Sequence, residues 1–322
     1  MAIHFGIIGL GEIAKRFAGV LHTIENIELT AVASKDSKKA VQFAEEYHAA
    51  KYYTSYEDLM TDEDVDIIYI ALTHNFHFEA VKKCLEHKKA VICEKPLVTN
   101  YADALELIQL SQKNQVLLME AMWTRCIPTF QKAKEWVLNG SIGTPKLVHA
   151  SFSFNAPFNP ENRLYNPDLA GGSLYDAGVY PIEFAIGILD ETPTMAQGSA
   201  SFCPTGVDDF VAMNMCFESG ALATLSCGIS ANSSQNAFVY GTEGYVVVYD
   251  FLGSHKCERY DNQNQLMDSF EMDFEDGFVF EIQHVCQLLK EKQIESPLIP
   301  HKDSLACAGV FDTLKQQFKE QK

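Results

Sequence analysis

Residues 3–14 read Ile-His-Phe-Gly-Ile-Ile-Gly-Leu-Gly-Glu-Ile-Ala, an apolar run that leads directly into the spacing G-x-G-x-x-A. In this pattern Gly9 permits a tight turn, Gly11 lets an anion approach the backbone, and Ala14 keeps the next helix close to the sheet. The N-terminus of that helix presents unpaired N–H groups to the anion. The stretch therefore predicts a dinucleotide-binding turn, which includes Glu12 and Ile13.

The pattern of apolar residues predicts two domains. Up to residue 121, short runs that are apolar throughout alternate with amphipathic helices, which is typical of a doubly wound parallel sheet covered on both faces. Residues 1–121 are thus expected to form an α/β Rossmann domain. Residues 122–322 are expected to form an α+β domain with a large, mainly antiparallel open sheet. Helices over residues 173–189 and 276–292 are placed on one face of that sheet. The last helix, near residues 304–320, belongs to the second domain or packs back on the first.

Composition narrows the class of protein. The 322 residues include 25 Lys and Arg against 43 Asp and Glu, a net charge of -18, which disfavours nucleic acid and anionic membrane surfaces as partners. Nine cysteines are scattered without a CxxC pair, as in proteins whose thiols stay reduced. No stretch approaches the roughly 18 apolar residues of a membrane span. The N-terminal apolar run is interrupted by glycines, unlike a signal peptide. A cytoplasmic protein is expected.

The end of the second strand indicates which dinucleotide binds. An NAD site places a carboxylate there, about 20 residues beyond the glycines, but this strand ends Ala31-Val32-Ala33-Ser34-Lys35. Ser34 can donate a hydrogen bond to a 2′-phosphate, and Lys35 can neutralise its charge. This favours NADP over NAD. Lys38 or Lys39 lies nearby. The alternative is that Lys35, Lys38 and Lys39 only form a solvated helix start.

Two motifs carry candidate chemistry. Glu94-Lys95-Pro96 comes at the end of the fourth parallel strand, at the sheet edge where α/β proteins bind ligands. Residues 171–180, Gly-Gly-Ser-Leu-Tyr-Asp-Ala-Gly-Val-Tyr, place Asp176 and Tyr180 four residues apart, on one helix face. A lysine, a carboxylate and a phenol can handle the proton in alcohol–carbonyl interconversion. Taken singly, each motif also fits an ordinary strand end or a packed helix.

Together and in this order, the three motifs resemble the glucose–fructose oxidoreductase/inositol dehydrogenase (Gfo/Idh/MocA) family over essentially the whole chain. Within it they are most similar to the branch of dimeric dihydrodiol dehydrogenase-like members. The resemblance implies that Lys95 is catalytic and touches the nicotinamide ribose. It also implies that Asp176 and Tyr180 flank the substrate.

The resemblance implies further site residues. Trp123, in Met122-Trp123-Thr124-Arg125, is expected to wall the nicotinamide or substrate pocket, and Phe154 to face the same pocket. Arg163 is expected to anchor the substrate or its loop. Cofactor contacts are expected from Thr73, Asn75, His77, Glu94 and Arg125. The family pattern Thr-Pro-Asn-x-x-His is one residue shorter here, with His74 in place of proline. His74 and His77 lack a nearby third ligand, so no metal site is expected.

These features predict an NADP(H)-dependent oxidoreductase that transfers a hydride between the nicotinamide and a hydroxyl or carbonyl carbon of a sugar, polyol or cyclic diol. The alternatives are an NAD-dependent inositol-type dehydrogenase of the same family and a non-catalytic dinucleotide-binding sensor. The strand over residues 210–217 has an apolar face that should pack on helix 173–189. Its opposite face is uncharged, and the next strand adds either residues 222, 224 and 226 or residues 223, 225 and 227. An uncharged open face predicts a two-fold contact with a second copy of the chain. The family resemblance implies a homodimer or a dimer of dimers.

Overall fold

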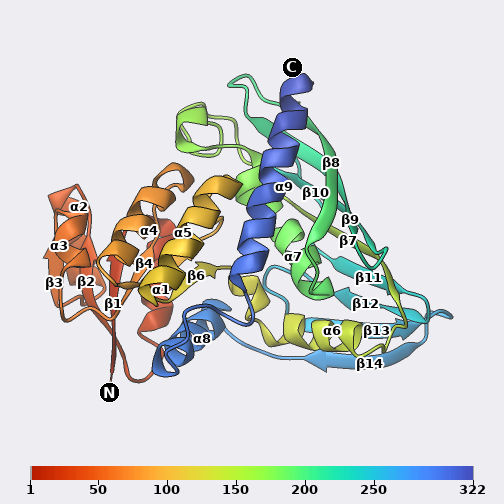
Figure 1. Ribbon diagram of the computed structural model, residues 1–322, viewed down its shortest axis with the longest axis horizontal. Helices are drawn as coiled ribbons and strands as arrows, with labels where there is room; N and C mark the ends of the chain where they lie inside the picture. Colours follow the sequence, from red (N-terminus) through yellow and green to blue (C-terminus); the bar gives the residue numbers. More distant parts are fainter. Residues whose placement is uncertain (1, 322) are drawn as a thin grey trace. The chain divides into compact units, whose positions relative to one another are not determined.

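The computed structural model describes residues 2–321, which divide into two units (Figure 1). Unit 1 contains residues 2–98, 102–121 and 278–301, and unit 2 contains residues 99–101, 122–277 and 302–321. The chain therefore returns to unit 1 after residue 277 and ends in unit 2.

Unit 1 is built on a parallel sheet of six strands in the order β3-β2-β1-β4-β5-β6. The central strands are buried on both faces, which is why their sequences are apolar throughout. The strands are β1 (Ile3–Ile8), β2 (Ile27–Ala33), β3 (Lys51–Tyr53), β4 (Ile67–Ile70), β5 (Ala90–Glu94) and β6 (Leu118–Ala121). The helices are α1 (Glu12–Leu21), α2 (Ser37–Glu46), α3 (Tyr56–Met60), the 3-10 turn η1 (His74–Phe76), α4 (His77–Glu86) and α5 (Tyr101–Asn114). The predicted Rossmann fold is confirmed.

Helix α8 (Phe278–Lys290) also lies in unit 1, where it packs against α1 (Figure 1). The ring of Phe278 contacts Phe17, and the Arg16 guanidinium lies 4.0 Å from the centre of that ring. The expectation that residues 276–292 cover the antiparallel sheet is therefore wrong. The helix is amphipathic, and this property alone does not say which apolar surface its buried face covers.

Unit 2 is built on an eight-stranded sheet in the order β14-β13-β12-β11-β7-β10-β9-β8. All neighbours are antiparallel except β7 and β10, as the predicted mainly antiparallel sheet requires. The strands are β7 (Pro145–Ser153), β8 (Pro193–Phe202), β9 (Asp208–Phe217), β10 (Leu222–Gly228), β11 (Ala237–Gly241), β12 (Gly244–Val248), β13 (Lys256–Asp261) and β14 (Leu266–Glu271). The helices are η2 (Trp123–Arg125), α6 (Pro128–Leu138), η3 (Pro167–Leu169), η4 (Leu174–Gly178), α7 (Val179–Leu189) and α9 (His301–Glu320).

Helices α6 and α7 cover one face of this sheet. The inward side chains of β9 are Val211, Met213, Met215 and Phe217, which are 4% exposed or less, as predicted. The last helix, α9, packs on β8: the Gln317 side chain bonds the backbone of Gly198 and Ala196. Residues 302–320 of this helix belong to unit 2.

Candidate active site

The glycine-rich turn of unit 1 has the geometry of an anion cradle. Gly9 has φ +89°, and a Cβ at this position would lie 2.6 Å from the Ala71 carbonyl oxygen. Gly11 caps α1 without a side-chain hydrogen bond, and a Cβ there would meet no atom within 4 Å. The first N–H groups of α1 are thus accessible to a pyrophosphate, so these residues fit a dinucleotide. Of the predicted neighbours, Glu12 is exposed and pairs with Lys15, and Ile13 is half-buried.

The end of β2 has the features expected of a 2′-phosphate site. Ser34 is 9% exposed, and its Oγ accepts a hydrogen bond from the Asp36 backbone N–H. The hydroxyl hydrogen of Ser34 can therefore donate to a ligand. The Asp36 carboxylate caps α2 by accepting from two backbone N–H groups, so it does not substitute for the ribose-binding acid of an NAD site. The Lys35 side chain is exposed beside the Tyr56 ring.

The loop after β4 places Thr73 and Asn75 at the surface, joined by a 2.8 Å hydrogen bond between their side chains. His77 is different, because its ring is fully buried. Its Nδ1 lies 2.9 Å from the Pro96 carbonyl oxygen and its Nε2 lies 2.9 Å from that of Leu72. Burial lowers the pKa of the ring and favours its neutral form. The prediction that the His77 side chain contacts the cofactor is wrong, since the ring instead ties together the loops after β4 and β5.

The Glu94-Lys95-Pro96 motif follows the end of β5 as predicted. The Glu94 carboxylate is buried and accepts a 2.5 Å hydrogen bond from the hydroxyl of Tyr69 on β4. Burial raises the pKa of Glu94, and the nearby Lys95 and the Tyr69 hydrogen bond oppose this shift. The Lys95 side chain is half-buried, and the Lys95–Pro96 peptide bond is cis. Glu94 is thus an interior group that supports Lys95, held by a tyrosine that the sequence analysis did not identify.

In unit 2, Asp176 and Tyr180 lie where a π-helical turn passes into α7. The π-helix spans Leu174–Gly178, and α7 begins at Val179. Single π-helical turns are rare and occur frequently at functional sites. Asp176 is 7% exposed and Tyr180 is 9% exposed, so both side chains reach the surface by a small area only. The predicted helix is present, although its first turn is wider than an α-helical spacing implies.

Asp208, at the start of β9, fixes the beginning of this helix. Its fully buried carboxylate accepts hydrogen bonds from the Leu174 backbone N–H (2.7 Å), the Ser173 hydroxyl (3.1 Å) and the Lys315 ammonium (3.1 Å). Gly172 has φ +118°, and a Cβ there would lie 2.7 Å from Asp208 Oδ1. The sequence analysis missed Asp208, because no local pattern connects it with a helix 34 residues earlier.

Aromatic side chains contact Tyr180. The Trp123 indole N–H points at this oxygen at 3.5 Å, and the Phe152 ring packs edge-on against the Tyr180 ring. Phe154 contacts Phe152 from the end of the same strand, as the alternation of β7 implies. Phe152 was not predicted, although it lies two residues before Phe154 and shares its face.

Arg163 extends from the loop before the helix and donates a 2.9 Å hydrogen bond from Nη1 to the Asp176 carboxylate. The Arg163 side chain is 49% exposed and the Asp176 side chain 9% exposed, so this ion pair lies at the boundary with solvent. Within unit 2, contacts thus link Trp123, Tyr180, Phe152 and Phe154, and an ion pair joins Arg163 to Asp176, which precedes Tyr180 by four residues.

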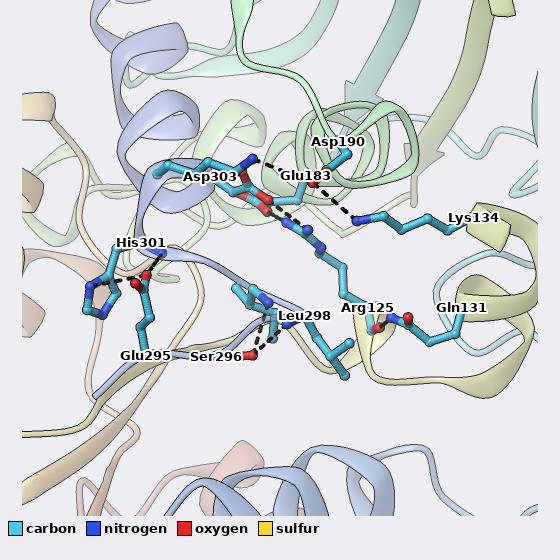
Figure 2. A network of polar contacts seen from close by, with 12 residues as sticks. Arg125, Gln131, Lys134, Glu183, Asp190, Glu295, Ser296, Leu298, His301 and Asp303 are labelled. Atoms are coloured by element: carbon cyan, nitrogen blue, oxygen red, sulfur yellow. Dashed lines mark hydrogen bonds and ion pairs between the residues drawn. The ribbon is translucent and has the colours of Figure 1, made fainter. Parts of the chain in front are cut away.

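Arg125 does not occupy the predicted position. Its side chain is fully buried, with Nη1 2.9 Å from Glu183 and Nη2 2.7 Å from Asp303 (Figure 2). Burial disfavours the charged form, but the two carboxylates raise the pKa of the guanidinium. The prediction that Arg125 contacts the cofactor is therefore wrong for its side chain. Its partners Glu183 and Asp303 are distant in the sequence, and no local pattern indicates them.

Residues 2–321 lack two further features. No group of three or more His, Cys, Asp or Glu side chains is arranged to hold a metal ion. None of the helices combines the length and the apolar character that a membrane span needs.

Similarity to known proteins extends over nearly the whole chain. Residues 3–122 match the GFO/IDH/MocA oxidoreductase family with an NAD-binding Rossmann fold, and residues 130–247 match the GFO/IDH/MocA C-terminal domain. Trans-1,2-dihydrobenzene-1,2-diol dehydrogenase of Mus musculus is 31% identical over 325 residues, 98% of this chain and 97% of the relative. The Homo sapiens enzyme of the same name is 30% identical over 328 residues, again 98% of this chain and 97% of the relative.

Solved structures agree in fold. A 3-ketoreductase from Actinomadura kijaniata, in complex with NADP and TDP-benzene, superimposes with a TM-score of 0.86 at 25% identity, over 98% of each chain. Aldose-aldose oxidoreductase from Caulobacter crescentus superimposes with a TM-score of 0.88 at 23% identity, over 100% of this chain and 98% of the other. The phosphate-binding turn, the Glu-Lys-Pro motif and full-length similarity thus agree, and the chain belongs to the Gfo/Idh/MocA family of NAD(P)-binding oxidoreductases.

Proposed function

We propose that the protein is an NADP(H)-dependent oxidoreductase that acts on a hydroxyl or carbonyl carbon of a sugar, polyol or cyclic diol. The observation that carries the proposal is the position of Tyr180, whose hydroxyl lies 3.5 Å from the Trp123 indole nitrogen and whose ring packs against Phe152. Aromatic rings suit the carbon face of a cyclic substrate, and the phenol and carboxylate suit its hydroxyl groups. The names of the relatives, a dihydrodiol dehydrogenase and a 3-ketoreductase, support this substrate class.

Each side chain has a distinct part in the proposed reaction. The bound nicotinamide supplies or accepts the hydride. Tyr180 donates the proton to the substrate oxygen during reduction and removes it during oxidation. Lys95 holds that oxygen and favours the ionised phenol by its charge. Asp176, restrained by Arg163, binds a neighbouring hydroxyl. Glu94, held by Tyr69, keeps a carboxylate beside Lys95.

The catalytic part is tested with Tyr180→Phe and Lys95→Met. Turnover is followed at 340 nm with a panel of polyols, sugars and cyclic diols, and binding is followed by NADPH fluorescence. Both variants should lower kcat by about 10²-fold or more, the scale of lost acid–base catalysis. Only Lys95→Met should also weaken NADPH. Tyr175→Phe is the matched control, because Tyr175 packs on Phe311 instead. Normal turnover by Tyr180→Phe would contradict the assignment, and binding without turnover by the wild type would favour a dinucleotide sensor.

For the cofactor, we propose that Ser34 and Lys35 bind the 2′-phosphate of NADP. Lys35→Ala should weaken NADPH by about 1–2 kcal/mol, the scale of a charge-assisted contact, and leave NADH nearly unchanged. Ser34→Asp should reverse the preference, because a carboxylate repels the phosphate and binds the ribose. Lys113→Ala, at an exposed position of α5, is the control. Equal losses for both cofactors in Lys35→Ala would exclude this assignment.

For assembly, we propose a homodimer, or a dimer of dimers, formed through the outer face of the sheet of unit 2. Thr224 pairs with Asn214 and Leu222 with Cys216, whereas residues 223, 225 and 227 are buried. Ten outward residues of β8, β9 and β10 are uncharged, and the Asp209 carboxylate at the start of β9 binds the Ser201 hydroxyl at the edge of this face. The uncharged residues are Met195, Gln197, Ser199, Ser201, Ala212, Asn214, Cys216, Leu222, Thr224 and Ser226. A neutral face of this size supports a two-fold contact with a second copy.

Light scattering at micromolar concentration should give at least twice 36.0 kDa. Asn214→Lys should lower the mass, whereas Gln112→Lys, on an exposed position of α5, should not. A wild-type monomer would exclude the proposed contact.

A cytoplasmic location is also proposed, because the nine cysteines are unpaired, as expected in a reducing compartment.

A further inference from the structure

One buried guanidinium joins three elements of unit 2. Arg125 ends the turn η2, Glu183 lies in α7 and Asp303 lies in the first turn of α9, and all three side chains are fully buried (Figure 2). Gly187 is shaped for this contact, because a Cβ there would lie 2.6 Å from the central carbon of the guanidinium. The three charges thus form a defined cluster, which we call the Arg125 cluster.

Stability is a poor reason for the Arg125 cluster. Two carboxylates face one guanidinium, and Arg125 Nε and Asp303 Oδ1 have no hydrogen-bond partner among residues 2–321. Buried charges lose their hydration, and replacing such a group by uncharged residues is often neutral or stabilising. The planar guanidinium does, however, fix the direction of each bond that it donates. The cluster is therefore suited to fixing positions rather than to adding stability.

The elements that it joins carry the groups around the proposed proton donor. Trp123 begins the turn that Arg125 ends, and the turn is closed by bonds from Arg125 N to Met122 O and from Cys126 N to Trp123 O. Tyr180 lies on α7, three residues before Glu183, which is less than one helical turn. The Arg125–Glu183 bond therefore holds the backbone of Trp123 next to the backbone of Tyr180. A shift of this bond would change the 3.5 Å contact between the two side chains.

We infer that Arg125, with Glu183 and Asp303, is a positioning residue that sets the Trp123 indole against the Tyr180 hydroxyl. This inference rests on the proposed role of Tyr180 in proton transfer. The cluster itself touches neither substrate nor cofactor. Its contribution is to keep the phenol and the indole in one arrangement, and small displacements of such groups reduce turnover strongly.

The test uses Trp123 as its own reporter. The chain has two tryptophans, Trp123 and Trp136, so a Trp136→Phe background leaves Trp123 emission alone. In this background Arg125→Met, Arg125→Lys and the uncharged triple variant Arg125→Met/Glu183→Gln/Asp303→Asn are compared. The measurements are Trp123 emission, its quenching by acrylamide, the urea midpoint, and kcat and KM as functions of pH.

Positioning predicts that the triple variant recovers the urea midpoint that Arg125→Met loses, because no charge remains buried alone. Its kcat should stay about 10–100-fold low, the scale of a misplaced catalytic group, and its Trp123 emission should stay red-shifted and more easily quenched. Arg125→Lys should have a urea midpoint, a kcat and a Trp123 emission between those of the wild type and those of Arg125→Met. Arg259→Met, which removes an arginine that bonds Ser141 elsewhere in unit 2, should leave emission and kcat unchanged.

A triple variant with wild-type Trp123 emission and wild-type kcat would overturn the inference, since the cluster would then serve stability only. If Arg125→Met does not fold, the triple variant decides alone. Failure of the proposed function gives a different result. In that case Tyr180→Phe would keep its turnover, whatever effect the Arg125 substitutions have on Trp123 emission.

Discussion

Removing the Asp208 carboxylate should destabilise unit 2 more than most single changes, because three donors converge on it. In Asp208→Ala the Leu174 N–H and the Ser173 hydroxyl remain buried without their acceptor, and Lys315 loses its counter-ion. Breaking a buried charged pair costs about 3–5 kcal/mol. The Lys315 side chain is 33% exposed and can be partly rehydrated. We therefore expect a loss of about 3–4 kcal/mol.

Asp208→Asn separates the contribution of the bonds to the helix from that of the bond to Lys315. Oδ2 receives both bonds from the helix and Oδ1 receives Lys315, so an asparagine can keep its oxygen toward the helix. Only the bond to Lys315 is then lost, at about 1.5–3 kcal/mol for a bond to a charged group. Adding Lys315→Met to Asp208→Asn should lower the free energy of unfolding only a little further. The double-mutant cycle should give a coupling energy of about 1–2 kcal/mol.

The assay is urea unfolding at fixed protein concentration, followed by tryptophan emission. Trp123 and Trp136 both belong to unit 2, so the signal reports the unit that contains Asp208. Asp312→Asn is the matched control, because Asp312 accepts a bond from the Tyr101 backbone N–H at an exposed position of α9. A loss below 1 kcal/mol in Asp208→Ala, or additive effects of Asp208→Asn and Lys315→Met, would refute the reasoning.

Three further outcomes are expected. Burial would raise the pKa of Glu258, but Lys256 and the hydroxyls of Tyr249 and Tyr260 lower it from 4.5 to about 2. A carboxyl group whose pKa is lower in the folded than in the unfolded protein stabilises the fold at pH values above its unfolded pKa. At neutral pH the free energy of unfolding of the wild type should therefore exceed that of Glu258→Gln by at most about 3 kcal/mol. This difference should vanish as pH falls from 4.5 to 2, and urea midpoints that differ equally at every pH would contradict it. His77→Leu should weaken NADPH and NADH alike, by about 1–2 kcal/mol, because the ring that lies between the two loops and donates a hydrogen bond to one of their carbonyl groups is lost; unchanged fluorescence titrations would exclude a role for the ring. Gly9→Ala should abolish measurable dinucleotide binding and lower the melting temperature, since the new Cβ meets the Ala71 carbonyl, whereas Gly19→Ala in the interior of α1 should be stabilising by about 0.5–1 kcal/mol.

The comparison of sequence and structure separates two kinds of information. The parallel sheet, the glycine turn, the lack of an acid at the end of β2 and the helix that carries Asp176 and Tyr180 were all predictable. Each depends on residues within about one strand or one helix of each other, where periodicity and backbone preferences act directly. Three strands of unit 2, β8, β13 and β14, have no clear signal in the sequence. β8 is rich in Ser, Gly and Ala, and β13 and β14 are charged or exposed, so none has the apolar alternation of a buried strand.

Tertiary structure decided the partners of the buried polar groups. Arg125 pairs with carboxylates 58 and 178 residues away, and Asp208 caps a helix that precedes it by 34 residues. His77 binds the Pro96 carbonyl, 19 residues on, rather than a ligand. α8 covers α1 rather than the sheet of its neighbours in sequence. A short segment determines that a charged side chain or an apolar face needs a partner. Which partner it meets depends on segments brought together by the whole fold, since many distant groups could satisfy the same requirement.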